Sequence, residues 1–277
     1  MATSPQGIPY KDLKHFVNVD GQCIYTRGWA PSDNIKLRGL CLILHGATEH
    51  SGRFSKIAIP LTGLGVMVYA HDHVGHGQSE GDRVDITDFH IYVRDTLQHV
   101  DIIKEKYPKL PIFLIGNSMG GAIAILTAME RPKQFTSVVT IGPAIKLNES
   151  LISDSYQNKK IIPETLTRDP KEIELFRTDP LVYHDVMKPR FLSQLHSATM
   201  EIQSKMASVC WSFFILHGDA DVLCDIEGSK MMVEKAQSTD KRLQVYPGHY
   251  HALAAEPPQN AVVVLRDITS WIGTRLP

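Results

Sequence analysis

A serine between two glycines, at the point where an apolar run gives way to a helix-like run, constrains this chain more than any other feature. Residues 116–120 read Gly-Asn-Ser-Met-Gly, the G-x-S-x-G pattern of a nucleophile elbow centred on Ser118. The preceding residues 112–115 are typical of a buried strand, and residues 119–130 are typical of a helix. Flanking glycines suit a strained turn in which a Cβ would collide with nearby backbone. Because the pattern also arises by chance in ordinary Gly-Ser turns, a nucleophilic Ser118 requires a base and an acid elsewhere in the chain.

Strand-like and helix-like segments alternate along most of the chain, which predicts an α/β fold with a mostly parallel central sheet and helices on both faces. The expected strands span residues 23–29, 39–44, 66–70, 112–115, 137–141, 213–216 and 242–246. One helix is well marked, because Asp88 can cap it and Tyr107-Pro108 ends it. With 277 residues, the chain can bury the core of one large α/β domain spanning residues 1–277.

The strand pattern disappears between about residues 144 and 209, which predicts an inserted helical cap. A polar stretch comes first, and helical pieces bounded by Pro170, Pro180 and Pro189 follow it. The last of these helices gathers apolar side chains on one face, namely Phe191, Leu195, Ala198, Ile202 and Met206. This face can pack against the core or form a wall of a substrate site, and ordinary packing is the simpler interpretation.

Charge and cysteine content exclude several classes of function. The formal net charge is −1 and no block of Lys or Arg is present, so no nucleic-acid partner is expected. The four cysteines, which have no C-x-x-C spacing, argue against a zinc site or a disulfide framework and fit a reducing compartment. The N-terminal residues lack a basic start followed by an apolar stretch, and no apolar run is long enough to span a bilayer. From the cysteine content and the lack of a leader-like or spanning segment, we expect a cytoplasmic protein that contacts membranes at most at their surface.

The acid and the base that a nucleophilic serine needs follow Ser118 in the order Ser, Asp, His. Asp221 lies in a loop after the expected strand 213–216, where this architecture places functional groups. Its competitors are Asp219, Asp225 and Glu227, and the position of Asp219 directly after the strand suits a turn or cap. After the strand that ends at Tyr246 come two histidines, and His251, just before a helix-prone run, is favoured over His249.

Acyl transfer also needs two N–H donors for the oxyanion. One is expected from Met119, the residue after the nucleophile, at the positive end of the following helix. The other is expected from the loop after the strand 39–44. In that loop Ala47 is the predicted donor, and Gly46 allows close approach of the backbone.

Residues 71–76, which read HDHVGH, raise the alternative of a metal site, since imidazole and carboxylate groups bind zinc. The spacing is short and no second cluster of ligands accompanies it. The segment reads better as the start of a glycine-rich turn beside the floor of the site, so no metal is expected.

Three segments together resemble a known family. Residues 45–53 read HGATEHSGR, residues 70–81 read AHDHVGHGQSEG and residues 118–128 read SMGGAIAILTA. They resemble the monoacylglycerol lipases, serine hydrolases of the α/β-hydrolase superfamily, and the resemblance covers nearly the whole chain. It implies the α/β-hydrolase fold, with Ser118, Asp221 and His251 as the catalytic triad and with Ala47 and Met119 as the oxyanion hole. Glu49 and Arg53 are implied at the glycerol end of the substrate.

Members of this family cleave a monoacylglycerol ester to a free fatty acid and glycerol without a cofactor, and they dock on membranes through an apolar cap. The chain departs from the family pattern at four places: Asn117 replaces a histidine, Ala254 replaces a second histidine, Phe176 replaces a tyrosine, and residues 157–160 are polar. These departures imply a changed rate, relaxed head-group selectivity and weaker membrane affinity. They are also what a diverged viral copy of a cellular gene would show.

Two other functions are compatible with the same residues. A lysophospholipase or broad carboxylesterase would use the same triad, because specificity resides in the cap. A catalytically weak lipid-binding protein is a second alternative, motivated by Asn117 and the polar cap. The intact triad residues weigh against it. The sequence does not determine the oligomeric state.

Overall fold

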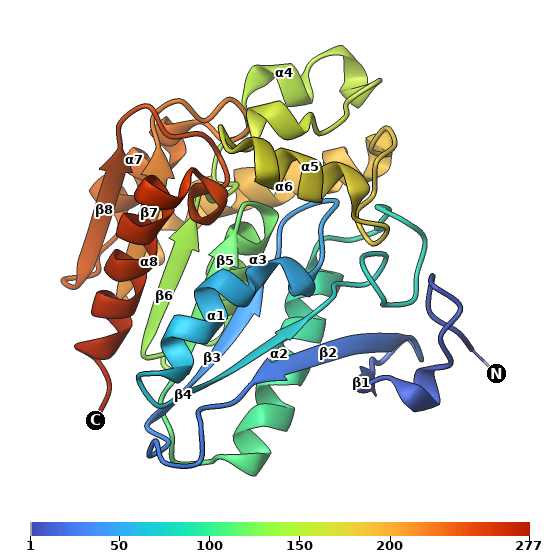
Figure 1. Ribbon diagram of the computed structural model, residues 1–277. Coiled ribbons are helices and arrows are strands. Elements are labelled where there is room, and N and C mark those ends of the chain that lie inside the picture. The colour runs from blue at the N-terminus through green and yellow to red at the C-terminus, as the bar shows by residue number, and fades with distance from the viewer. Residues whose placement is uncertain (1) are drawn as a thin grey trace.

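A mostly parallel sheet of eight strands runs through the middle of the protein (Figure 1). The computed structural model describes residues 2–277. The strand order is β1-β2-β4-β3-β5-β6-β7-β8, in which β1 and β2 are antiparallel to their neighbours and the other pairings are parallel. The strands are β1 (His15–Val17), β2 (Cys23–Trp29), β3 (Gly39–Leu44), β4 (Val66–His71), β5 (Ile112–Asn117), β6 (Ser137–Ile141), β7 (Phe213–Gly218) and β8 (Lys241–Tyr246).

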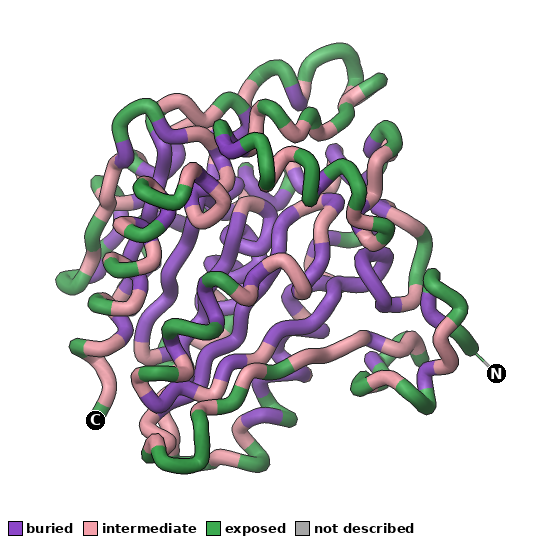
Figure 2. Tube along the Cα trace, in the orientation of Figure 1, coloured by how far each residue is buried: buried purple, intermediate pink, exposed green. Residues whose placement is uncertain are grey.

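The seven strands expected from the sequence are all present, and four of them extend one or two residues further. The prediction omitted β1, because its three residues alternate between exposed and half-buried and give no clear apolar pattern. The central strands β3, β5, β6 and β7 are buried along their whole length (Figure 2). This burial on both faces is typical of a parallel sheet covered by helices.

Helices cover both faces of this sheet (Figure 1). Helices α1 (Ser55–Thr62) and α8 (Pro258–Gly273) contribute side chains to one core cluster, and α2 (His90–Lys106), α3 (Met119–Glu130) and α7 (Ile226–Lys235) contribute to the other. The expected start of α2 is confirmed, because an Asp88 carboxylate oxygen accepts a hydrogen bond from the His90 N–H at 2.9 Å. The helix ends at Lys106, directly before Tyr107-Pro108.

The segment between β6 and β7 contains no strand and lies over the carboxyl ends of the parallel strands (Figure 1). Its helices are α4 (Glu149–Ile152), α5 (Pro170–Thr178) and α6 (Pro189–Lys205), and prolines begin both long ones. The face of α6 predicted to be apolar is buried in the core cluster that contains α2 and α3. Short 3₁₀ turns occur at Tyr10–Asp12, Ser51–Phe54, Asp154–Tyr156, Pro163–Thr165, Met206–Ser208 and Leu253–Ala255. Within residues 2–277, every helix is too short or too polar to cross a bilayer.

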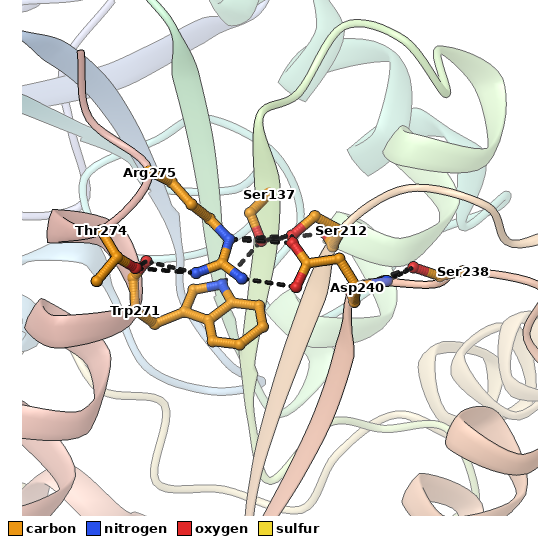
Figure 3. Close-up of polar contacts among 7 residues, drawn as sticks. All are labelled: Ser137, Ser212, Ser238, Asp240, Trp271, Thr274 and Arg275. Carbon is orange, nitrogen blue, oxygen red and sulfur yellow. Dashed lines mark hydrogen bonds and ion pairs between the residues drawn. The ribbon is translucent and has the colours of Figure 1, made fainter.

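A polar network attaches the C-terminal helix to the sheet at the end opposite the cap (Figures 1 and 3). The Trp271 indole N–H donates to the Ser137 hydroxyl at 2.9 Å, and its ring stacks on Phe214 with centroids 4.9 Å apart. The Arg275 guanidinium lies over the Trp271 ring and pairs with Asp240 at 2.6 Å. These contacts fix the C-terminal end of α8 against the first residues of β6 and β7 and the residue before β8.

Candidate active site

Ser118 lies on a sharp turn between β5 and α3, as the sequence predicted. Its backbone has φ 55° and ψ −118°, a strained conformation for a residue with a side chain. A Cβ added at Gly116 would lie 2.2 Å from the Gly120 carbonyl oxygen, and one added at Gly120 would lie 2.1 Å from that of Leu44. Both glycines are therefore required for this turn, which directs the Ser118 side chain toward a pocket under the cap.

Asp221 and His251 come from different loops and meet beside this turn. Asp221 follows β7 and His251 follows β8, and the imidazole Nδ1 lies 2.6 Å from a carboxylate oxygen of Asp221. The other carboxylate oxygen accepts from the backbone N–H groups of Leu223 and Cys224, at 2.8 and 3.0 Å. These two donors fix the orientation of the carboxylate.

The pKa of Asp221 is lowered and that of His251 is raised, which are the directions expected when a carboxylate stabilises a protonated imidazole. Burial raises the pKa of Asp221, but the interactions with His251 and His217 outweigh it and bring the pKa below its usual range. Burial lowers the pKa of His251, and the Asp221 carboxylate more than compensates, so this pKa is raised above 6.5. Asp221 therefore stays ionised, and His251 is poised to accept a proton near neutral pH.

The competing residues are used in other ways. One Asp219 oxygen accepts from the Gly248 N–H at 2.6 Å, which is the turn role expected for it. Asp225 caps α7 by accepting from the Glu227 N–H at 2.9 Å. The His249 imidazole contacts the Pro247 carbonyl rather than an acid.

Ser118 and His251 open into one pocket that core and cap line together. Ala47, Ala254 and Phe54 supply part of its core wall. The cap contributes apolar side chains, namely Ile161, Pro163, Leu166 and Phe176. Charged side chains also reach the lining, namely Glu49, Arg53, Lys56 and Glu172. The apolar face of α6 does not contribute to this lining, which agrees with ordinary packing of that helix. The pocket is thus mainly apolar, with charged groups among its walls.

The predicted oxyanion loop lies against the nucleophile turn. A Cβ added at Gly46 would lie 3.1 Å from the Cβ of Ser118, so the two segments are in close contact. Within residues 2–277, the backbone N–H groups of Ala47 and Met119 donate to no acceptor of the protein, which leaves them available to a ligand. Their role as oxyanion donors stays a prediction.

Glu49 and Arg53, implied as glycerol contacts, make polar contacts with the protein itself. One Glu49 oxygen accepts from the Gly46 N–H at 2.7 Å and from the Asn117 side-chain amide at 3.0 Å. The other lies 3.6 Å from Arg53, whose guanidinium stands 5.1 Å from the centre of the Phe176 ring. Glu49 therefore joins the oxyanion loop to the nucleophile turn, and Asn117 is its partner there.

The histidine-rich segment, residues 71–76, is a buried loop, and the carboxylate of its Asp72 accepts hydrogen bonds from backbone N–H groups. Asp72 accepts from the N–H groups of Ser51 and Gln78, at 2.8 and 2.7 Å. His71 and His76 are almost fully buried, and burial lowers the pKa of each to about 3. The His73 N–H donates to the His45 ring at 2.9 Å, which connects this loop to the start of the oxyanion loop.

Sequence reasoning assigned no role to His217 or Cys224, which both contact Asp221 of the predicted triad. The His217 Nε2 lies 3.2 Å from the Asp221 carboxylate, and its other ring nitrogen contacts the Ser229 hydroxyl at 2.7 Å. The Cys224 thiol is buried, and its donor atom and those of Asp221 and His251 all lie within 4.8 Å of one another. A metal ion bound there would occupy Asp221 and His251, the predicted acid–base pair. The only sequence signal for a role of His217 was its position four residues before Asp221.

The chain is similar to known proteins along nearly its whole length. Residues 35–258 match the family model described as serine aminopeptidase, S33. Human monoglyceride lipase is 42% identical over 98% of this chain and 94% of that protein. A monoglyceride lipase homolog of monkeypox virus is 34% identical, over 94% of this chain and 97% of that protein. The expected viral origin stays a prediction.

A solved structure extends the likeness to three dimensions. The crystal structure of the Paleococcus ferrophilus monoacylglycerol lipase superposes with a TM-score of 0.77 at 26% identity, over 91% of this chain and 99% of that one. The likeness therefore extends over almost the whole fold described above. The chain therefore belongs to the monoglyceride lipase family of hydrolases with the α/β-hydrolase fold.

Proposed function

We propose that this protein hydrolyses monoacylglycerols to a free fatty acid and glycerol, with Ser118, Asp221 and His251 as its triad. The observation that carries the proposal is one pocket lined by both Ser118 and His251, in which the His251 Nδ1 lies 2.6 Å from the Asp221 carboxylate. The full-length similarity to monoglyceride lipases supports the choice of substrate. The apolar cap residues suit an acyl chain, and the charged side chains of Glu49 and Arg53 in the pocket lining suit a hydroxylated head group.

The proposed reaction is acyl transfer through a covalent intermediate. His251 takes the proton of Ser118 as the serine oxygen attacks the ester carbonyl, and Asp221 stabilises the resulting imidazolium. The amides of Ala47 and Met119 donate to the oxyanion. His251 returns the proton to the departing glycerol oxygen. A water then attacks the acyl-enzyme with His251 again as base, and the bond to the Ser118 oxygen breaks as His251 protonates that oxygen and the fatty acid leaves.

Hydrolysis of a long-chain monoacylglycerol by the purified protein, beside a lysophospholipid of the same chain, tests this function. Selective release of fatty acid from the monoacylglycerol is the expected result. Comparable turnover of both lipids would identify a broad esterase, for which Ala254 offers a reason because its small side chain lines the pocket. No turnover of either lipid would favour a lipid-binding protein.

The pH dependence of kcat/KM should report the titration of His251. The imidazole must be neutral to accept the serine proton, so kcat/KM should fall as the pH decreases through an apparent pKa above 6.5. Asp221, whose pKa is lowered, stays ionised over this range and adds no second step. Initial rates between about pH 5 and 8 check this. A flat profile would contradict His251 as the base.

We also infer that the pocket entrance contacts a lipid surface. Three large apolar side chains, Ile59, Ile162 and Leu175, are more than half exposed, and each lies one or two residues from a pocket-lining residue. The variant Ile162→Ser/Leu175→Ser should therefore sediment less with phosphatidylcholine vesicles than the unchanged protein. The matched control is Val262→Ser on α8, equally exposed but outside the pocket lining. Equal sedimentation of all three proteins would contradict this contact.

A further inference from the structure

The backbone on both sides of His251 is held by groups outside its own turn. The Tyr250 N–H donates to a carboxylate oxygen of Glu256 at 2.6 Å. The Ala252 N–H donates to the Leu166 carbonyl, in the cap, at 2.8 Å. The two residues that flank the proposed base therefore have fixed partners, and one of these partners belongs to the cap.

Glu256 is fully buried, and both of its oxygens are used. One accepts from Tyr250, and the other pairs with the Arg168 guanidinium of the cap at 2.8 Å. A carboxylate this deeply buried needs such partners, because an unpaired buried charge is strongly unfavourable. Arg168 itself is partly exposed and also lies 5.8 Å from the centre of the Tyr250 ring.

A third contact joins the same two segments. The Thr167 hydroxyl donates to the Ala255 carbonyl at 2.7 Å. Residues 166–168 of the cap thus contact residues 250–256 through a backbone hydrogen bond, a hydroxyl hydrogen bond and an ion pair. Leu166, Thr167, Ala252 and Ala255 also line the substrate pocket, whereas Arg168 and Glu256 do not.

We propose that Arg168 and Glu256 are positioning residues that align His251 with Asp221 and Ser118 by fixing the histidine loop to the cap. The proposal rests on the proposed role of His251 as the base. The 2.6 Å contact between His251 and Asp221 joins two separate loops, so it depends on where each loop is held. The same contacts make the alignment of the base depend on the cap segment that forms a wall of the pocket.

Loss of the ion pair should impair chemistry more than substrate binding. In Arg168→Gln, the buried Glu256 loses its charged partner and the turn at Tyr250 should shift. A displacement of about 1 Å at a reacting group can cost roughly 100-fold in rate. We therefore expect kcat to fall about 10- to 100-fold with KM little changed, because Arg168 does not line the pocket.

The pH profile separates positioning from general destabilisation. Asp221 raises the pKa of His251, so a looser contact between them should move the acid limb of kcat/KM to lower pH. Arg168→Lys keeps a cationic donor and should recover part of kcat. The double variant Arg168→Gln/Glu256→Gln replaces the ion pair by neutral amides and should exceed Arg168→Gln in rate. A control is Arg190→Gln, which removes another ion pair between cap and core, at 2.6 Å from Asp85, and should leave kcat unchanged.

The rate of covalent labelling by a fluorophosphonate keeps the test independent of the lipid substrate. The unchanged protein should label at Ser118, and Arg168→Gln should label about 10- to 100-fold more slowly at a temperature where circular dichroism shows that it is still folded. If the unchanged protein does not label, the proposed triad fails rather than the positioning role. If it labels and both Arg168→Gln and Arg168→Lys match its rate and pH profile, the positioning role is overturned. Should Arg168→Gln not fold, wild-type kinetics in Arg168→Lys and in the double variant would overturn it equally.

Discussion

Ser118→Ala should abolish ester hydrolysis while leaving the protein folded. The substitution removes the attacking oxygen. Without it no acyl-enzyme can form, whatever His251 and the oxyanion donors contribute. In a serine protease, loss of the nucleophile costs roughly a millionfold in kcat. We expect a loss of that order for a long-chain monoacylglycerol, measured as fatty acid released per enzyme.

The fold should tolerate this change, because alanine meets about the same backbone strain as serine at φ 55°. The free energy of unfolding should change by less than about 1 kcal/mol, measured by urea unfolding. The matched control is Ser204→Ala, which removes an exposed hydroxyl on α6 and should retain full activity. Substantial turnover by folded Ser118→Ala would exclude Ser118 as the nucleophile.

The parts of the fold that were predictable from the sequence have local causes. The buried runs of β3, β5 and β7 and the apolar stripe of α2 are visible in short windows of sequence. The strand β1 could not be found, because it exists only through pairing with β2 and its residues carry no apolar pattern. The expected helix boundaries at Pro170 and Pro189 are confirmed, because these prolines are the first residues of α5 and α6.

The candidate site likewise has residues that the sequence could predict and contacts that it could not. Ser118, Asp221 and His251 could be proposed because each follows a recognisable strand and their order along the chain is informative. The contact between Glu49 and Asn117 joins residues 68 positions apart, and no local sequence pattern predicts it. Glu256 precedes two prolines and reads as a surface residue, yet it is fully buried with a cap arginine as its partner. Such contacts depend on tertiary packing and become visible only in three dimensions.

Asp221→Asn should lower kcat about 10⁴-fold with little change in the fold, because it imposes the wrong histidine tautomer. The Leu223 and Cys224 N–H groups bind one side-chain oxygen of Asp221, so the amide oxygen of asparagine should take that position. Its NH₂ group would then face His251 Nδ1, where it can only donate. Nδ1 would become an acceptor and the ring proton would move to Nε2, so that the imidazole could no longer accept the proton of Ser118.

The matched control for this change is Asp219→Asn. Its side-chain oxygen can still accept from the Gly248 N–H, so its kcat should stay within a few-fold of the unchanged protein. In Asp221→Asn, the acid limb of the residual rate should also move to lower pH, because the carboxylate that raises the pKa of His251 is gone. Steady-state rates across the pH range measure both effects. A folded Asp221→Asn within tenfold of wild type would mean that another acid, such as Asp225, orients the base.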